Sequence, residues 1–130
     1  MIVIDASTVI EWLLQTPAGR LIEQRVFSKP EILCAPYLLD LEVAQVLRRL
    51  ARAGNISDLR ADEAIGDFLS TRIARYPHSV LLPRIWQLRH NLSAYDASYV
   101  ALAEKLDVSL ITRDSRLASA SGHTAKIELF

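Results

Sequence analysis

Short runs of apolar, β-branched residues alternate along the chain with longer segments in which apolar residues recur every three or four positions. The first run, Ile2–Ile4, has no polar alternation, which is typical of a strand covered by helices on both faces. A helical pattern follows it at about residues 8–15. Further runs predict strands at Glu31–Ala35, Val108–Thr112 and Ala125–Phe130.

Helices are predicted in the intervening segments. Their spans are about 18–27, 37–53, 59–72, 84–91, 94–106 and 115–120. Residues 73–82 are ambiguous, with a short strand near Ile73–Tyr76, and Trp86 is expected to face inward. Strands separated by helices form parallel β–α–β units. The pattern therefore predicts one α/β domain over residues 1–130, a parallel twisted sheet of about four to five strands with helices on both faces.

Composition narrows the partners that the chain can have. Of its 130 residues, 51% are apolar, and 15 basic residues balance 15 acidic ones. A strongly basic field over the whole protein is therefore excluded, and any contact with nucleic acid must come from a local patch. Twelve of the basic residues are Arg, the residue type best suited to bidentate phosphate contacts.

The single cysteine and the lengths of the apolar runs indicate the cellular compartment of the protein. Cys34 is the only cysteine, which excludes an internal disulfide and fits a reducing compartment. Asp5 interrupts the apolar N-terminal run, so no signal peptide is evident. No stretch approaches the ~18 uninterrupted apolar residues of a membrane span. We expect a soluble, cytoplasmic protein.

Two acidic residues directly follow predicted buried strands. Asp5 comes after the first strand and Asp114 after the strand that ends at Thr112. Because the carboxyl ends of parallel strands share one edge of the sheet, both side chains are expected there, where ligands of open α/β sheets bind. Each also has a simpler interpretation as a helix cap, since Asp is favoured at that position.

Two further acids are expected at the same edge, near the beginnings of helices. Asp96 lies in the first turn of the helix that leads into the strand ending at Thr112, and Ser93-x-x-Asp96 is also consistent with a capping box. Glu42 lies in the second turn of the helix after the second strand, with Asp40 as the alternative candidate. Both Asp96 and Glu42 have apolar neighbours at helical spacing.

Four carboxylates at one edge would repel one another, so the cluster needs a cation. Oxygen ligands favour Mg²⁺ or Mn²⁺ over zinc. The three histidines have no zinc-site spacing, and neither a glycine-rich phosphate loop nor a Ser/His/Asp set is apparent. The remaining chemistry is metal-assisted hydrolysis, most naturally of a phosphodiester.

Four segments carry a resemblance to a known family. They are IVIDAS (2–7), LEVAQVLRR (41–49), LSAYDASYVALAE (92–104) and LITRDSRL (110–117). In this order and spacing the chain resembles PIN-domain ribonucleases, and specifically the VapC-type toxins of bacterial toxin–antitoxin modules. The resemblance covers almost all 130 residues.

The resemblance implies an endoribonuclease that depends on Mg²⁺ or Mn²⁺. Its catalytic and metal-binding residues would be Asp5, Glu42, Asp96 and Asp114. Ser7 and Thr112 match polar positions that orient the carboxylates or a water at the metal. The resemblance also implies a homodimer, and a cognate antitoxin that occupies the acidic groove and neutralises the toxin.

An acidic groove that holds RNA should carry cations at its rim. The candidates are Arg48, Arg49, Arg52, Arg113 and Arg116. The first three end a predicted helix, where positive charge is favoured in any case.

Two other functions stay open. One is a catalytically silent PIN-fold module that binds RNA or a protein partner. The other is aspartyl phosphoryl transfer, but a receiver-like domain has an acidic pair after its first strand and a Lys after its last. Here Asp5 stands alone, and Phe130 lies within the last predicted strand.

Overall fold

Five parallel strands form a single sheet in the computed structural model, which describes all 130 residues. The strands are β1 (Ile2–Ile4), β2 (Leu33–Pro36), β3 (Ile73–Tyr76), β4 (Ser109–Thr112) and β5 (Lys126–Leu129). Their order across the sheet is β3-β2-β1-β4-β5, and every neighbouring pair is parallel. The ambiguous segment near Ile73–Tyr76 is thus a strand at one edge of the sheet.

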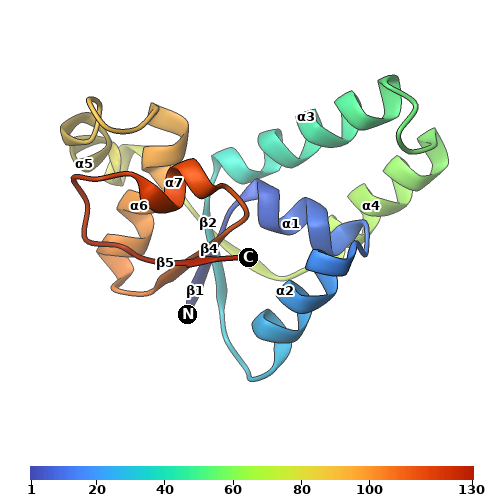
Figure 1. Ribbon diagram of the computed structural model, residues 1–130, viewed down its shortest axis with the longest axis horizontal. Coiled ribbons are helices and arrows are strands. Elements are labelled where there is room, and N and C mark those ends of the chain that lie inside the picture. The colour runs from blue at the N-terminus through green and yellow to red at the C-terminus, as the bar shows by residue number, and fades with distance from the viewer.

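Helices cover both faces of this sheet, as the sequence predicts. They are α1 (Ala6–Leu13), α2 (Pro17–Phe27), α3 (Leu38–Arg52), α4 (Asp58–Ser70), α5 (Leu82–Gln87), α6 (Ala94–Leu106) and α7 (Ser115–Ser119), with a 3₁₀ turn η1 at His78–Val80. Figure 1 shows α1 to α4 on one side of the sheet and α5 to α7 on the other. None of these helices has both the length and the apolar character needed to cross a bilayer.

The chain builds the sheet outward from β1 in both directions. Val3 of β1 lies opposite Cys34 of β2 on one side and opposite Leu110 of β4 on the other. The segments that follow β1 and β4 therefore leave toward opposite faces of the sheet. Such a reversal opens a crevice at the carboxyl ends of the strands.

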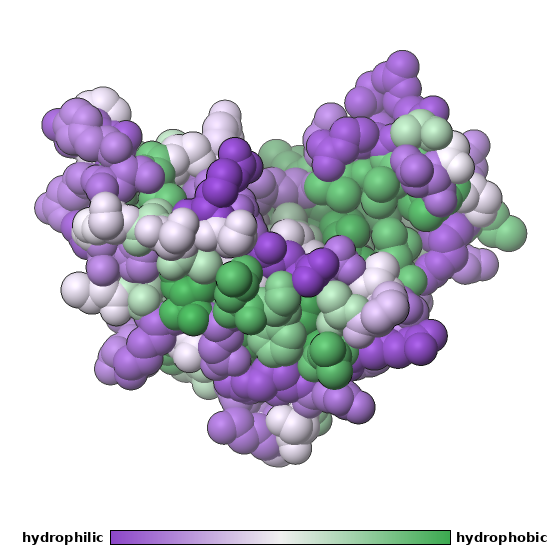
Figure 2. Space-filling model, viewed as in Figure 1, coloured by the Kyte–Doolittle hydropathy of each residue, from purple (hydrophilic) through white to green (hydrophobic).

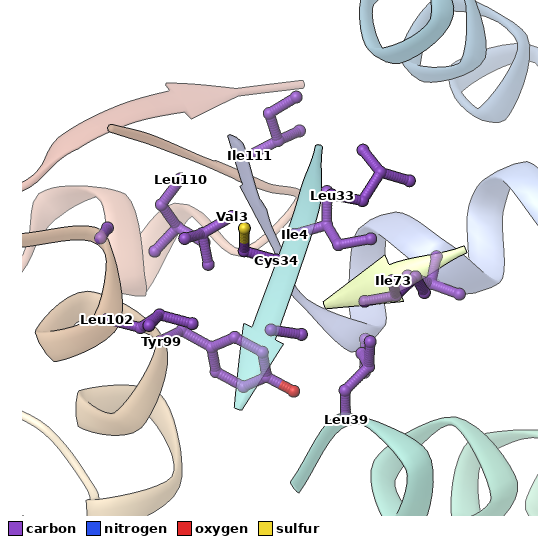
Figure 3. Close-up of a cluster of buried hydrophobic side chains, with 14 of the residues drawn as sticks. Val3, Ile4, Leu33, Cys34, Leu39, Ile73, Tyr99, Leu102, Leu110 and Ile111 are labelled. Atoms are coloured by element: carbon purple, nitrogen blue, oxygen red, sulfur yellow. The ribbon is translucent and has the colours of Figure 1, made fainter. Parts of the chain in front are cut away.

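The core is centred on β1, which has no exposed face. Ile2, Val3 and Ile4 are all at most 1% exposed and belong to a cluster of 31 buried residues. Figure 3 shows side chains of β1, β2 and β4 in this cluster together with Tyr99 and Leu102 of α6. A fully buried strand explains the apolar run at the start of the sequence.

The main departures from the sequence predictions occur at a proline and a tryptophan. Pro36 was expected to follow the second strand but is its last residue, because the Tyr37 N–H still bonds to the carbonyl of Tyr76 at 3.0 Å. The expectation that Trp86 faces inward is wrong: it is 65% exposed. The six-residue helix α5 buries one narrow face through Ile85, and Trp86 lies outside that face.

Candidate active site

A cleft of about 430 Å³ opens at the carboxyl edge of the sheet. Its walls come from α1, α3, α6 and the turn before α7, and all four acids identified from the sequence line it: Asp5, Glu42, Asp96 and Asp114. In Figure 2 the surface is hollowed between the lobe of α5 to α7 and the lobe of α3 and α4. Segments separated by more than 100 residues thus contribute to one site.

Asp5 is held by hydrogen bonds on both carboxylate oxygens. Its Oδ1 accepts from the Thr8 N–H at 2.9 Å and from Ser7 Oγ at 2.7 Å, while its Oδ2 accepts from Thr112 Oγ1. The residue is only 6% exposed. Asp5 is therefore a helix cap and a residue of the cleft at once, and the cap fixes where its carboxylate points.

Asp114, which follows β4, likewise caps a helix and lines the cleft. Its Oδ1 caps α7 by accepting from the N–H groups of Arg116 at 2.9 Å and Leu117 at 3.4 Å. Its own N–H donates to Thr112 Oγ1 at 3.0 Å. The hydroxyl of Thr112 therefore joins Asp114 to Asp5.

Glu42 is held from the opposite wall by a tyrosine. The Tyr99 hydroxyl of α6 donates to Glu42 Oε1 at 2.5 Å. Figure 3 shows the Tyr99 ring in the core, with its oxygen directed away from Leu102. Burial raises the pKa of Glu42, and the negative charges of Asp96 and Asp5 raise it further, against the opposing hydrogen bond from Tyr99. Burial raises the pKa of Tyr99, and the hydrogen bond to Glu42 and the negative charges of Glu42, Asp5 and Asp96 raise it further, so the hydroxyl is a neutral donor.

Asp96 lies half-buried in the first turn of α6. Its N–H donates to Ser93 Oγ at 3.1 Å, so Ser93 is the cap of this helix. Burial raises the pKa of the Asp96 carboxyl, followed by repulsion from Asp114 and Asp5. These effects mean that the carboxylates lie close enough to disfavour one another's charge.

Two findings refine the candidate set. Asp40, the alternative to Glu42, does not line the cleft; it binds the guanidinium of Arg75 with Nε–Oδ1 and Nε–Oδ2 distances of 2.8 and 3.0 Å. Tyr99 also lines the cleft, and it is not among the site residues predicted from the sequence. Its position three residues after Asp96, on the same helix face, is the signal that could have found it.

The donor atoms of the cleft suit a hard divalent cation. No group of three or more His, Cys, Asp or Glu side chains forms a preassembled metal cluster in this structure. The lining is nevertheless rich in carboxylate oxygens, and burial, followed by repulsion from neighbouring carboxylates, raises the pKa values of Glu42 and Asp96. Mg²⁺ keeps several waters and needs only one or two direct carboxylates, so a spaced set of acids fits it.

The arginine candidates separate in the structure. Arg49 lines the cleft, whereas Arg48 and Arg52 do not. Arg113 lies 3.9 Å from a carboxylate oxygen of Glu11 and donates to the last carbonyl of the chain. Arg116, with a side chain 94% exposed, is 3.8 Å from Asp114.

The sequence is similar to that of a known protein family and of characterised relatives. The model of the PIN domain matches residues 2–122. Ribonuclease VapC1 of Mycobacterium tuberculosis is 44% identical over 128 residues, which are 98% of this chain and 96% of the relative.

Solved structures share the fold at lower identity. The VapC20 structure from Mycobacterium tuberculosis, described as a sarcin–ricin loop cleaving toxin, has a TM-score of 0.68 at 19% identity and covers 95% of this chain and 97% of its own. A toxin–antitoxin complex from Klebsiella pneumoniae has a TM-score of 0.61 at 18% identity, with coverage of 92% and 91%.

Proposed function

The chain belongs to the PIN-domain family. We propose that it is a divalent-metal-dependent endoribonuclease that acts as the toxin of a toxin–antitoxin pair. Its relative VapC1, matched at 44% identity over nearly the full length of both chains, is a ribonuclease. The observation that carries the proposal is the cleft in which Asp5, Glu42, Asp96 and Asp114 meet.

We assign Mg²⁺ or Mn²⁺ as the cofactor, held by these four acids. When bound, the cation lowers the pKa of water and neutralises charge on the scissile phosphate. The protein's own part is to hold the carboxylates in place: Ser7 and Thr112 fix Asp5, and Tyr99 fixes Glu42. In-line attack of water on the RNA phosphodiester would leave a 3′-hydroxyl and a 5′-phosphate.

An antitoxin would neutralise the enzyme by occupying the same cleft. Ile10 and Val46 line it beside the acids, so part of its wall is apolar. In Figure 2, hydrophobic surface lies on the α3 side of the hollow. A peptide segment that combines a cation with apolar side chains would complement both features.

We also propose that the protein is a homodimer acting in the cytoplasm. Large apolar side chains are exposed near the α5–α6 connection: Leu82 is 56%, Trp86 65% and Tyr95 64% exposed. Leu82 and Tyr95 also line a shallow apolar groove of about 170 Å³ together with Leu38 and Ile85. Light scattering should then give twice the 14.6 kDa mass of the chain.

Expression in a bacterial host tests the toxin role. We expect the wild-type chain to arrest growth on induction and the Asp96→Asn chain to leave growth unaffected at the same protein level. Calorimetric titration with Mn²⁺ should show binding to the wild type and much weaker binding to the variant. Equal growth arrest by both chains would contradict the proposal.

A further inference from the structure

The cleft presents an electrostatic problem for a ribonuclease, because it must hold a polyanion. Of its 12 lining residues, five are acidic: Asp5, Glu11, Glu42, Asp96 and Asp114. Arg49 is the only basic residue among the 12. One or two divalent cations would offset the charge next to the reacting phosphate, but the flanking phosphates of the strand need another partner.

Arg49 lies on the same face of α3 as Glu42. The residues that α3 contributes to the cleft are Glu42, Gln45, Val46 and Arg49. Spacings of three, four and seven residues place them along one face of the helix. Arg49 is therefore two turns beyond Glu42, or about 10 Å along the axis. Figure 1 shows α3 running from the sheet edge outward along its lobe, which leads away from the acids.

The guanidinium of Arg49 is available for a ligand. The residue is exposed and forms no salt bridge or side-chain hydrogen bond within the chain. Arg25, Arg75 and Arg84, in contrast, each bind a carboxylate through short contacts of 2.8 Å. Five free donors in a planar fork suit a phosphate group.

Helix electrostatics alone do not explain this placement. Positive charge is favoured in the last turn of α3, which contains Arg49 and Arg52. That effect depends on position along the axis and is the same for any side of the helix. The helix dipole therefore does not explain why Arg49 lines the acidic cleft while Arg48 and Arg52 do not.

We infer that Arg49 is a substrate-binding residue that contacts a phosphate flanking the scissile one, with the polar side chain of Gln45 beside it. The inference rests on the proposed ribonuclease function. Its distance from the acids assigns Arg49 to the positioning of the RNA strand rather than to bond cleavage. Such a contact adds affinity that is independent of base sequence.

Binding of a labelled RNA tests this assignment without requiring turnover. The probe is a fluorescein-labelled, 20-nucleotide single-stranded RNA of mixed sequence, titrated at several concentrations of monovalent salt with the full Asp96→Asn chain. Arg49→Ala should weaken binding roughly tenfold. The slope of log K against log salt should fall by about 0.7, the value for one phosphate contact on a single strand. Arg49→Lys should keep the slope and lose only part of the affinity.

Arg72→Ala is the matched control. It removes the same charge from an exposed arginine at the amino end of β3, at the opposite edge of the sheet. We expect it to leave both affinity and slope at the parent values. In the otherwise wild-type enzyme, Arg49→Ala should raise KM with little change in kcat, as loss of uniform binding does.

The outcomes separate the two proposals. If the wild type cleaves RNA and the two arginine variants bind the probe alike, the role of Arg49 is wrong and the ribonuclease function stands. If the wild type neither cleaves RNA nor binds the probe, both are wrong.

Discussion

At the scale of single residues, the cleft is organised by hydroxyl groups. Thr112 Oγ1 donates to Asp5 and accepts from the Asp114 N–H, Ser7 Oγ donates to Asp5, and Tyr99 donates to Glu42. Each carboxylate keeps oxygen lone pairs free after these contacts. The hydroxyls therefore restrict where the carboxylates point without neutralising them, which is what a cation site requires.

Tyr99→Phe tests the positioning of Glu42. Loss of the 2.5 Å hydrogen bond should lower kcat about tenfold and weaken Mn²⁺ binding, because the Glu42 carboxylate is no longer fixed. The free energy of unfolding should fall by about 1 kcal/mol. Tyr37→Phe is the control, since Tyr37 is 54% exposed. A variant that loses stability but keeps full kcat and metal affinity would show that Tyr99 serves packing alone.

Asp96→Asn tests the cost of burying a charged carboxylate beside other carboxylates. A raised carboxyl pKa means that the folded state binds the proton more tightly than the unfolded state, so folding is penalised when Asp96 is charged. In chelator at pH 7, the variant should therefore be more stable than the wild type toward urea. The difference should vanish as the pH falls below the ordinary Asp value of 3.8. A less stable variant at pH 7 would contradict this account.

At the scale of elements, ion pairs hold peripheral segments to the sheet and its helices. Arg84 of α5 contacts Glu104 of α6 at 2.8 and 3.1 Å and the carbonyl of Gly122 at 3.1 Å. Arg25 of α2 binds Glu128 of the edge strand β5 at 2.9 and 2.8 Å. Both arginines thereby fix segments that are distant in sequence.

Arg84→Ala tests the first of these links. The loss should cost about 1–2 kcal/mol in the free energy of unfolding, less than for a fully buried pair because Arg84 is one-third exposed. Burial alone would raise the pKa of Glu104, but Arg84 and the Thr124 N–H lower it. The stabilisation should thus be present above the ordinary Glu value of 4.5 and disappear as the pH falls. Equal stability of variant and wild type at pH 7 would contradict it.

The sequence predicts the contacts of the site that follow from sheet topology, but not those that depend on how the helices pack. Strand ends of a parallel sheet meet by topology, so the meeting of Asp5 and Asp114 follows from two apolar runs. The contact of Tyr99 with Glu42 joins residues 57 positions apart and depends on how α3 and α6 pack. The exposure of Trp86 depends on the shortness of α5, and periodicity gives no information on that. Helical spacing from Glu42 places Arg49 on the same helix face, but only the folded chain shows that this face lines the cleft.

In the whole molecule, the fold joins a fully buried core to an acidic cleft that only the long contacts of Arg113 and Arg116 offset from outside. The chain has no net charge, yet five carboxylates and one arginine line a single 430 Å³ cleft. Cores of this kind provide the rigid strand ends on which a site can be built. We expect the repulsion within the cleft to lower the stability of the metal-free chain, and a bound cation would relieve it.

Metal addition should therefore stabilise the whole domain. At 100 times the dissociation constant, Mg²⁺ or Mn²⁺ should add about 2.7 kcal/mol, or roughly 10 °C in Tm for a chain of this size. Chelator should reverse the shift, and the Asp5→Asn/Asp96→Asn chain should show little of it. A Tm that does not respond to metal in the wild type would exclude a shared site.

Cleavage of RNA tests whether the four acids form a metal-dependent nuclease site. Purified, antitoxin-free protein is incubated with a mixed cellular RNA pool in Mn²⁺ or Mg²⁺, with chelator, and as the Asp96→Asn variant. We predict discrete cuts with 5′-phosphate ends that disappear both with chelator and with the variant. Absence of cleavage by the folded wild type in every condition would contradict the account and leave a binding module.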